Sequence, residues 1–278
     1  MPFQARFGVS FDKRLMVSFL FSLDMNCKVK SVSSNEIIMQ GLPSYTIFPL
    51  GDSALTIDLG NVIDPGINEQ VISLFHHLTN RPLPNMKEAV PAYSSITIYY
   101  DFFESNKHKE PDQTTFEWMK QQAEDIITEG FETKKVVENN IRIPVCYSEE
   151  FGPDIKTIAE AKGISAEEVI NIHTSAAYKV FMLGFLPGFA YMGEVDEKIS
   201  YARKPKPEML KAGSVGIAGR QTGIYPLDSP GGWQIIGRTP LELFNKNNDQ
   251  LTLLNAGNSV QFYSITKDEF EDIKARNS

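Results

Sequence analysis

A glycine-dense stretch, residues 184–238, carries most of the residue types in this chain that could bind a small molecule. Ten of the 19 glycines fall inside it, in about a fifth of the 278 residues. Glycine adopts backbone angles that other residues avoid and lets a ligand or a second strand approach closely. The corners of β-barrels need glycine for the same reason. The glycine count alone therefore leaves a binding site and a structural role equally open.

The residues between these glycines favour a binding site. Phe185, Phe189 and Tyr191 lie among glycines in one predicted loop, where stacking on a planar ligand is more natural than packing in a core. Arg203 and Arg238 could each clamp a phosphate or a carboxylate, because the guanidinium fork matches both groups. A single arginine is nevertheless more often a surface charge.

One histidine lies near this stretch. His173 could act as a general base or hold a substrate by a hydrogen bond, although a structural histidine at a helix end is the commoner case. The chain contains no dinucleotide fingerprint, no GxxxxGK[ST] phosphate loop and no GxSxG nucleophile elbow. Cys27 and Cys146 have no metal-binding spacing, so we predict no metal ligands.

Composition narrows the class of protein. The net charge of -8 argues against nucleic acid as the main partner, which would require clustered Lys and Arg. The apolar run at residues 15–23 is too short to span a bilayer and is followed at once by Asp24, without a cleavage site. Two cysteines fit a reducing compartment. We therefore predict a cytoplasmic protein without a membrane partner.

The first half of the chain alternates strand and helix patterns. A strand pair, a helix opened by Asp64 and Pro65, a second strand pair and a second helix give the order β-β-α-β-β-α, which indicates an α+β sandwich. The predicted strands are residues 45–50, 54–59, 88–91 and 95–100, and the second helix is residues 114–128.

The second half predicts a β-barrel. A strand at residues 141–147 and helices at 154–162 and 165–174 precede short strands separated by Gly and Pro turns, a pattern typical of a closed or nearly closed barrel. These later strands are predicted at residues 180–183, 213–218, 233–236, 250–254 and 259–264, before a last helix at 267–275.

Ordered motifs add a resemblance. They are GFLPGFAYMG at residues 184–193, AGSVGIAG at 212–219, QTGIYP at 221–226, SPGGW at 229–233 and IGRTP at 236–240, with PLGDSA, VPAYSS and FGPD upstream. Together they closely resemble the family of the 5-oxoprolinase B subunit, which includes the sporulation kinase inhibitor and the allophanate hydrolase subunit 1 domain. The resemblance covers about residues 45–264.

The resemblance implies an α+β fold, with an N-terminal ferredoxin-like α/β domain at residues 42–137 and a C-terminal cyclophilin-like β-barrel domain at 138–278. It also implies a subunit that, with two other subunits, opens 5-oxoproline to glutamate using ATP with magnesium. Phosphorylation of the lactam oxygen would convert it into a leaving group. The alternative within the same family is an inhibitor that binds a sensor histidine kinase.

The resemblance also suggests site roles. Arg203, Arg238 and the amides of Gly231 and Gly232 would contact phosphate or carboxylate, with His173 as the third catalytic candidate. The other residues expected to bind substrate or nucleotide are Tyr178, Phe185, Pro187, Gly188, Phe189, Gln221, Thr222, Tyr225, Ser229 and Trp233.

Two segments depart from the family pattern. Between Arg203 and Ala212, relatives carry an additional arginine, whereas this chain reads KPKPEMLK, so Lys204 or Lys206 is the candidate replacement. Residues 1–41 resemble nothing in the family, and Met39 stands about where relatives begin. We therefore expect an N-terminal extension that arises from an upstream start codon.

Overall fold

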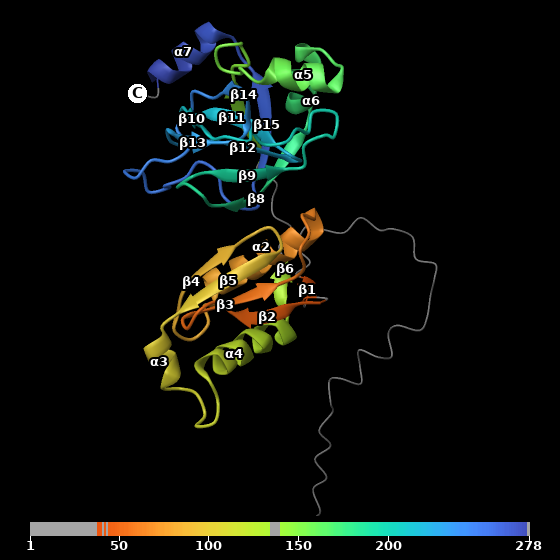
Figure 1. Cartoon of the computed structure of the whole chain (residues 1–278). Helices are drawn as coiled ribbons and strands as arrows, with labels where there is room; N and C mark the ends of the chain where they lie inside the picture. The colour runs from red at the N-terminus through yellow and green to blue at the C-terminus, as the bar shows by residue number, and fades with distance from the viewer. Residues whose placement is uncertain (1–37, 41, 43, 134–139, 277–278) are drawn as a thin grey trace, which may run out of the picture. The chain divides into compact units, whose positions relative to one another are not determined.

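The computed structural model describes residues 38–40, 42, 44–133 and 140–276 (Figure 1). The extension expected at residues 1–41 lies outside these described residues, apart from a short strand, β1 (Ile38–Gln40), that pairs with β6 (Phe131–Thr133). None of the helices in the described residues is long and apolar enough to cross a membrane.

The N-terminal half contains an antiparallel sheet of four strands in the order β2-β3-β5-β4. These strands are β2 (Thr46–Pro49), β3 (Ala54–Asp58), β4 (Met86–Pro91) and β5 (Ser95–Tyr100). Two long helices, α2 (Pro65–Asn80) and α4 (Thr115–Glu129), share its hydrophobic core. A short helix, α3 (Phe102–Asn106), was not predicted from the periodicity.

Local signals explain where these elements begin. The Asp64 carboxylate accepts a hydrogen bond from the Ile67 amide at 2.9 Å, and Pro65 takes the first helical position of α2. Thr114 and Glu117 form a reciprocal capping box at the start of α4. The six predicted strands and helices occur in the predicted order, and β1, α3 and β6 are present in addition.

The name ferredoxin-like is not confirmed for this half. The strand beside β3 at the sheet edge is β2, which reaches it through a tight hairpin, whereas β6 after α4 pairs with β1 instead. Gly51 supplies the positive φ of 66° at the hairpin turn. A contiguous hairpin closes a short loop, so it forms at a small entropic cost.

The C-terminal half contains a seven-stranded sheet in the order β14-β11-β12-β9-β8-β15-β7. Its two outer strands approach each other: Cys146 and Arg238 exchange backbone hydrogen bonds of 2.9 and 3.0 Å. The nearly closed β-barrel predicted from the sequence is therefore confirmed. The strands are β7 (Asn140–Val145), β8 (Ala177–Leu183), β9 (Ala190–Gly193), β11 (Ser214–Ala218), β12 (Gln221–Ile224), β14 (Gln234–Arg238) and β15 (Ser259–Ser264).

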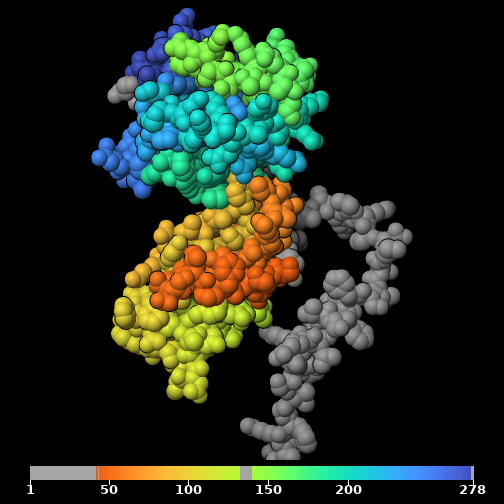
Figure 2. All heavy atoms as spheres, in the orientation of Figure 1, coloured from red at the N-terminus to blue at the C-terminus, as the bar shows by residue number. Residues whose placement is uncertain are grey.

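Three helices accompany this barrel. Helices α5 (Ile155–Lys162) and α6 (Ala166–Ser175) pack against each other and against β14 and β15 respectively. Their atoms, in green, form a continuous surface with the blue-green barrel strands in Figure 2. The last helix is α7 (Lys267–Arg276), and a two-stranded ribbon of β10 (Glu208–Leu210) and β13 (Ser229–Gly231) lies beyond β9 in the sequence.

Several barrel strands differ from the prediction. Strands β9, β10, β12 and β13 lie in glycine-rich or proline-rich segments whose alternation is too short to read. The strand predicted at residues 250–254 is wrong. That segment makes a tight loop in which the Asn245 amide donates to the Leu251 carbonyl, and only the Phe244–Thr252 bridge is strand-like.

Candidate functional site

A cavity of about 630 Å³ opens at strands β9, β11, β12 and β13 and at the loops around them. Its volume lies within the usual range for small-molecule sites. It is lined by Phe185, Phe189, Tyr191, Ala202, Arg203, Pro207, Ala218, Gly219, Gln221, Tyr225, Pro230, Gly231, Gly232 and Trp233. We call it the aromatic cavity.

The aromatic cavity has a rigid wall of rings that meet edge to face. The Phe189 ring lies at the centre of this wall, with centroid distances of 4.7 Å to Tyr191, 5.1 Å to Tyr225 and 5.4 Å to Trp233. Edge-to-face geometry is the favoured arrangement of aromatic pairs. Because Phe189 and Trp233 are buried, these rings present a fixed surface to a ligand.

Phe185 occupies the mouth of the aromatic cavity in an unusual backbone conformation. Its φ is 68°, in the left-handed region, and its side chain is 62% exposed. The ring contacts Phe189 edge to face at 5.6 Å. A bulky residue in this region carries strain, which clusters at functional sites.

Close approach of the chain explains two glycines: Gly231, which lines the aromatic cavity, and Gly223, which packs against two of its rings. A Cβ at Gly231 would lie 2.5 Å from the Tyr225 hydroxyl oxygen, and one at Gly223 would lie 2.9 Å from the Trp233 ring. Any side chain at either position would displace the aromatic wall. The backbone of β13 at Gly231 therefore forms part of the floor of the cavity.

Arg203 is the cation of the aromatic cavity. A Cβ at Gly232 would lie 3.7 Å from its Nη2 and 3.8 Å from its Nε, so the guanidinium extends along the Gly232 backbone. Burial raises the pKa of Tyr191 and of Tyr225, and the positive charge of Arg203 opposes both rises. The charge of Arg203 therefore reaches both phenol groups, which line the same cavity.

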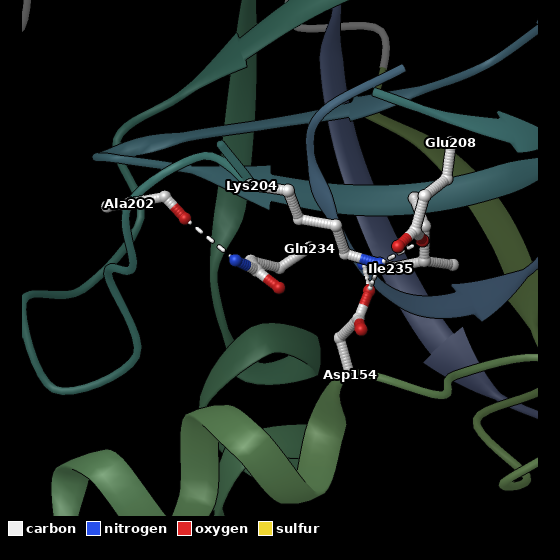
Figure 3. Close-up of polar contacts among 6 residues, drawn as sticks. All are labelled: Asp154, Ala202, Lys204, Glu208, Gln234 and Ile235. Atoms are coloured by element: carbon white, nitrogen blue, oxygen red, sulfur yellow. Dashed lines mark hydrogen bonds and ion pairs between the residues drawn. The ribbon is translucent and has the colours of Figure 1, made fainter. Parts of the chain in front are cut away.

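The segment that carries Arg203 is fixed by a polar network (Figure 3). Lys204 Nζ lies 2.8 Å from Asp154 Oδ2 and 2.7 Å from Glu208 Oε2. The Gln234 side chain donates to the Ala202 carbonyl at 2.9 Å. Two carboxylates already hold the Lys204 ammonium group, which argues against Lys204 as the anion-binding charge that replaces a missing arginine. Lys206, the other candidate, does not line the aromatic cavity.

His173, Tyr178 and Thr222 lie in the barrel core rather than on the aromatic cavity. The His173 ring is fully buried, with Nδ1 2.8 Å from the Tyr147 hydroxyl and Nε2 3.0 Å from Thr222 Oγ1. Burial lowers the pKa of His173 to about 3, so the ring is neutral. It stacks on Phe262 at 4.6 Å.

The two arginines singled out from the sequence are separated. Arg238 lines a second cavity of about 560 Å³, where its Nε donates to the Ala212 carbonyl at 2.8 Å. Of the other expected residues, Pro187, Gly188 and Ser229 do not line the aromatic cavity. Gly188 packs on Phe244, and the buried Ser229 lies on β13.

The aromatic cavity also contains residues that were not among those expected to bind substrate or nucleotide, although Tyr191 was noted as one of three loop aromatics. These are Tyr191, Ala202, Pro207, Ala218, Gly219 and Pro230. Tyr191 lies in the same motif as Phe185 and Phe189, and Gly219 ends another quoted motif, so both could have been included. Pro207 lies in the segment that departs from the family pattern and carried no such signal.

The chemistry available is recognition of a small, partly planar anion. One guanidinium, two phenol hydroxyls and glycine amides surround an aromatic wall, which suits a ring that carries a carboxylate or phosphoryl group. Among the described residues, no group of three or more His, Cys, Asp or Glu is placed to hold a metal ion.

Comparison with known proteins defines the class. The family model for the carboxyltransferase domain, subdomain C and D, matches residues 45–254, so the chain belongs to this family. It is 42% identical over 232 residues to the 5-oxoprolinase B subunit of Bacillus subtilis (strain 168), which covers 83% of this chain and 97% of that protein. The protein of the same name from Escherichia coli O157:H7 is 35% identical over 217 residues, 77% of this chain and 93% of that protein. The chain therefore belongs to the 5-oxoprolinase B subunit family, as its motifs predicted.

Solved structures agree on the fold. The crystal structure of TTHA0988 has a TM-score of 0.66 at 29% identity, with 76% of this chain matched to 40% of that one. The urea amidolyase of K. lactis has a TM-score of 0.64 at 21% identity, with 85% of this chain matched to 16% of that one. The second likeness shows a shared fold alone.

Proposed function

We propose that this chain is the subunit of an ATP-dependent 5-oxoprolinase that binds 5-oxoproline in the aromatic cavity. The observation that carries the proposal is Arg203, which lies along the Gly232 backbone between an aromatic wall and the glycine floor. Two relatives also support the proposal: both are named as the B subunit of 5-oxoprolinase, and both match this chain over nearly their whole length.

In this proposal each part of the cavity has one task. Arg203 and the amides of Gly231 and Gly232 bind the substrate carboxylate or the phosphorylated lactam, because a guanidinium and oriented amides favour such anions. The rings of Phe189 and Trp233 exclude water from the lactam ring. Gln221 and Tyr225 supply polar contacts, and Phe185 covers the mouth.

ATP enters the proposal as a co-substrate with magnesium. Its γ-phosphoryl passes to the lactam carbonyl oxygen, and one water adds to the carbonyl carbon. Cleavage of the ring C–N bond then leaves the γ-glutamyl phosphate, which a second water hydrolyses to glutamate and phosphate. One arginine and two glycine amides suit a single anionic group rather than a triphosphate. We therefore propose that the two partner subunits hold the rest of the nucleotide and complete the reaction in the cytoplasm.

We also propose a domain assignment for the two halves of the chain. We assign residues 42–137 to a ferredoxin-like domain and residues 138–278 to a cyclophilin-like barrel domain that carries the site. The inhibitor of a sensor histidine kinase is the less favoured function, because the relatives matched over nearly their full length are named for the oxoprolinase.

The test replaces the cation of the cavity. Arg203→Ala is expected to weaken binding of 5-oxoproline to the full chain by about 10- to 100-fold, since hydrogen bonds to charged groups contribute about 1.5–3 kcal/mol. Isothermal titration calorimetry measures the dissociation constant. Folding should be unchanged because Arg203 is exposed.

The matched control is Arg220→Ala, which removes a neighbouring arginine that pairs with Glu194 at 2.8 Å outside the cavity. Its affinity should equal that of the wild type. Equal affinities in all three proteins would contradict the role of Arg203. Rapid hydrolysis of 5-oxoproline by this chain without partner subunits would contradict the proposed division of labour.

A further inference from the structure

The wall segment, residues 202–208, contributes Ala202, Arg203 and Pro207 to the aromatic cavity but has no regular structure before β10 begins at Glu208. The place of Arg203 therefore depends on what holds the residues on either side of it. Two hydrogen bonds attach the segment to β14 and to the residue before Trp233. The Gln234 side chain donates through Nε2 to the Ala202 carbonyl, and the Lys204 backbone amide donates to the Gly232 carbonyl at 2.7 Å.

A side-chain contact links the same segment to a rigid element. Asp154 directly precedes helix α5, and its amide donates to the Ile235 carbonyl at 3.0 Å. Its Oδ2 accepts the Ile235 amide at 2.6 Å. Asp154 is thus hydrogen-bonded to β14 through both its backbone and its side chain. The same carboxylate forms the ion pair with Lys204 (Figure 3).

Lys204 completes the link. Its side chain is 15% exposed and that of Asp154 is 14% exposed, so the ion pair is largely shielded from water. Burial opposes the charge of Lys204, but the hydrogen bonds to Asp154 and Glu208 outweigh it and raise the pKa of the ammonium group. Lys204 therefore stays charged at neutral pH, and loss of its ammonium group leaves the shielded Asp154 carboxylate without its ion-pair partner.

We propose that the Asp154–Lys204 pair positions the wall segment so that Arg203 lies along Gly232, which makes Lys204 a positioning residue for ligand binding. The effect on 5-oxoproline rests on the proposed function, whereas the effect on the wall segment does not. Lys204 is the residue directly after Arg203, and its amide bonds the residue directly before Trp233. A shift of Lys204 is therefore transmitted to the cation and to the aromatic wall together.

The test uses Trp233 as a reporter of the wall segment. The chain has two tryptophans, and Trp118 lies on α4, so Trp118→Phe leaves Trp233 as the single emitter. Lys204→Met in this background removes the charge and keeps a long apolar side chain. Lys204→Arg is the conservative variant that can still bridge two carboxylates.

The control is Lys156→Met, which breaks an exposed ion pair between Lys156 on α5 and Glu149 before it. Acrylamide quenching of Trp233 and calorimetric binding of 5-oxoproline to the full chain are measured for every variant. Lys204→Met is expected to increase quenching and to weaken binding about tenfold or more, because small misplacements of a binding group cost that much. Lys204→Arg should restore both properties, and Lys156→Met should change neither.

The measurements separate the positioning role of Lys204 from the proposed function. A folded Lys204→Met chain with wild-type quenching and wild-type affinity overturns the proposal, as does a loss of affinity that Lys204→Arg does not restore. If the wild type binds no 5-oxoproline, the proposed function fails. Increased quenching in Lys204→Met that Lys204→Arg reverses would still support the positioning role in that case.

Discussion

At the scale of single residues, Phe185 combines two costs that a purely structural residue would avoid. Its backbone lies in the left-handed region at φ 68°, and most of its large apolar side chain faces water. A non-glycine residue in this region costs about 1–2 kcal/mol. The ring contacts Phe189 at the mouth of the aromatic cavity, which is where a ligand would cover it.

The contribution of the ring can be separated from the backbone strain. Phe185→Gly and Phe185→Ala both remove the ring, but only glycine also removes the strain. We expect Phe185→Gly to unfold at a higher urea concentration than Phe185→Ala, by about 1 kcal/mol in the free energy of unfolding. Both variants should bind 5-oxoproline more weakly than the wild type.

Equal stability of the two variants would show that position 185 is not strained. Wild-type affinity in both would exclude a contact between the ring and the ligand. Urea titration followed by fluorescence and calorimetry of 5-oxoproline binding provide the two measurements.

Residue type and spacing identified part of the aromatic cavity in advance. Phe185, Phe189 and Trp233 were expected to bind substrate or nucleotide, and the structure brings all three to the aromatic cavity. His173 and Thr222 were also expected at the site, but their side chains face the core. The orientation of a strand or helix, not the residue type, decides which side a side chain occupies. Sequence spacing could not reveal that orientation without the register of β12.

At the scale of elements, the floor of the aromatic cavity depends on how closely β13 approaches a tyrosine. Gly231 ends β13 with its Cα so near Tyr225 that a Cβ would overlap the hydroxyl group. Gly232, the next residue, has more space: a Cβ there would lie 3.4 Å from the Lys204 carbonyl oxygen. Adjacent glycines of one motif thus have different structural requirements.

This contrast predicts different results for the same substitution. Gly231→Ala should lower the free energy of unfolding by about 1–3 kcal/mol, because overpacking displaces the Tyr225 ring. Gly232→Ala should change it by no more than about 0.5 kcal/mol. Urea denaturation of both variants checks the prediction, and equal losses would contradict the geometry of the floor.

The glycines that permit this close packing also explain why the strands around the cavity were hard to predict. β12 and β13 are short and contain glycine or proline, so they lack the alternation of large apolar residues that identifies a strand. Residues 250–254 do alternate, yet Leu251 is exposed and the segment turns back on residues 243–245. The alternation of apolar residues shows which side chains share a face, but it cannot show whether a neighbouring strand is available for pairing.

At the scale of the whole molecule, the barrel is assembled by contacts between segments far apart in the chain. β15 pairs in parallel with β7, and the Cys146–Arg238 bridge joins the outer strands. The barrel class was predictable from short strands and turns, but the strand order was not, because long-range pairing leaves no local pattern. Within this barrel a hydrogen-bond chain connects Tyr147, His173 and Thr222.

The chain of hydrogen bonds requires a neutral His173. Thr222 Oγ1 donates to the Gly216 carbonyl, so it accepts from Nε2–H, and Nδ1 accepts from the Tyr147 hydroxyl. A proton on Nδ1 would remove that acceptor. Tyr178 and Phe262, whose rings also pack on His173, offer no negative charge that could compensate.

This requirement predicts how stability depends on pH. In the unfolded chain His173 takes up a proton near pH 6.5, whereas in the folded chain burial lowers its pKa to about 3. Between these values the unfolded state binds the additional proton, so stability is full above pH 6.5 and falls as the pH is lowered towards 3. The loss is about 1.4 kcal/mol per pH unit, or about 2 kcal/mol between pH 6.5 and 5.

His173→Gln provides the comparison, since it removes the titrating group and leaves His76, His77 and His108 in place. The variant should be less stable at pH 7, because the glutamine side chain cannot reproduce both hydrogen bonds and the stacking on Phe262. Between pH 6.5 and 5 its free energy of unfolding should fall less than that of the wild type, by about 2 kcal/mol. Urea denaturation at half-unit pH steps measures both slopes. Parallel slopes would mean that His173 titrates normally in the folded barrel, which its complete burial and its role as an acceptor for Tyr147 argue against.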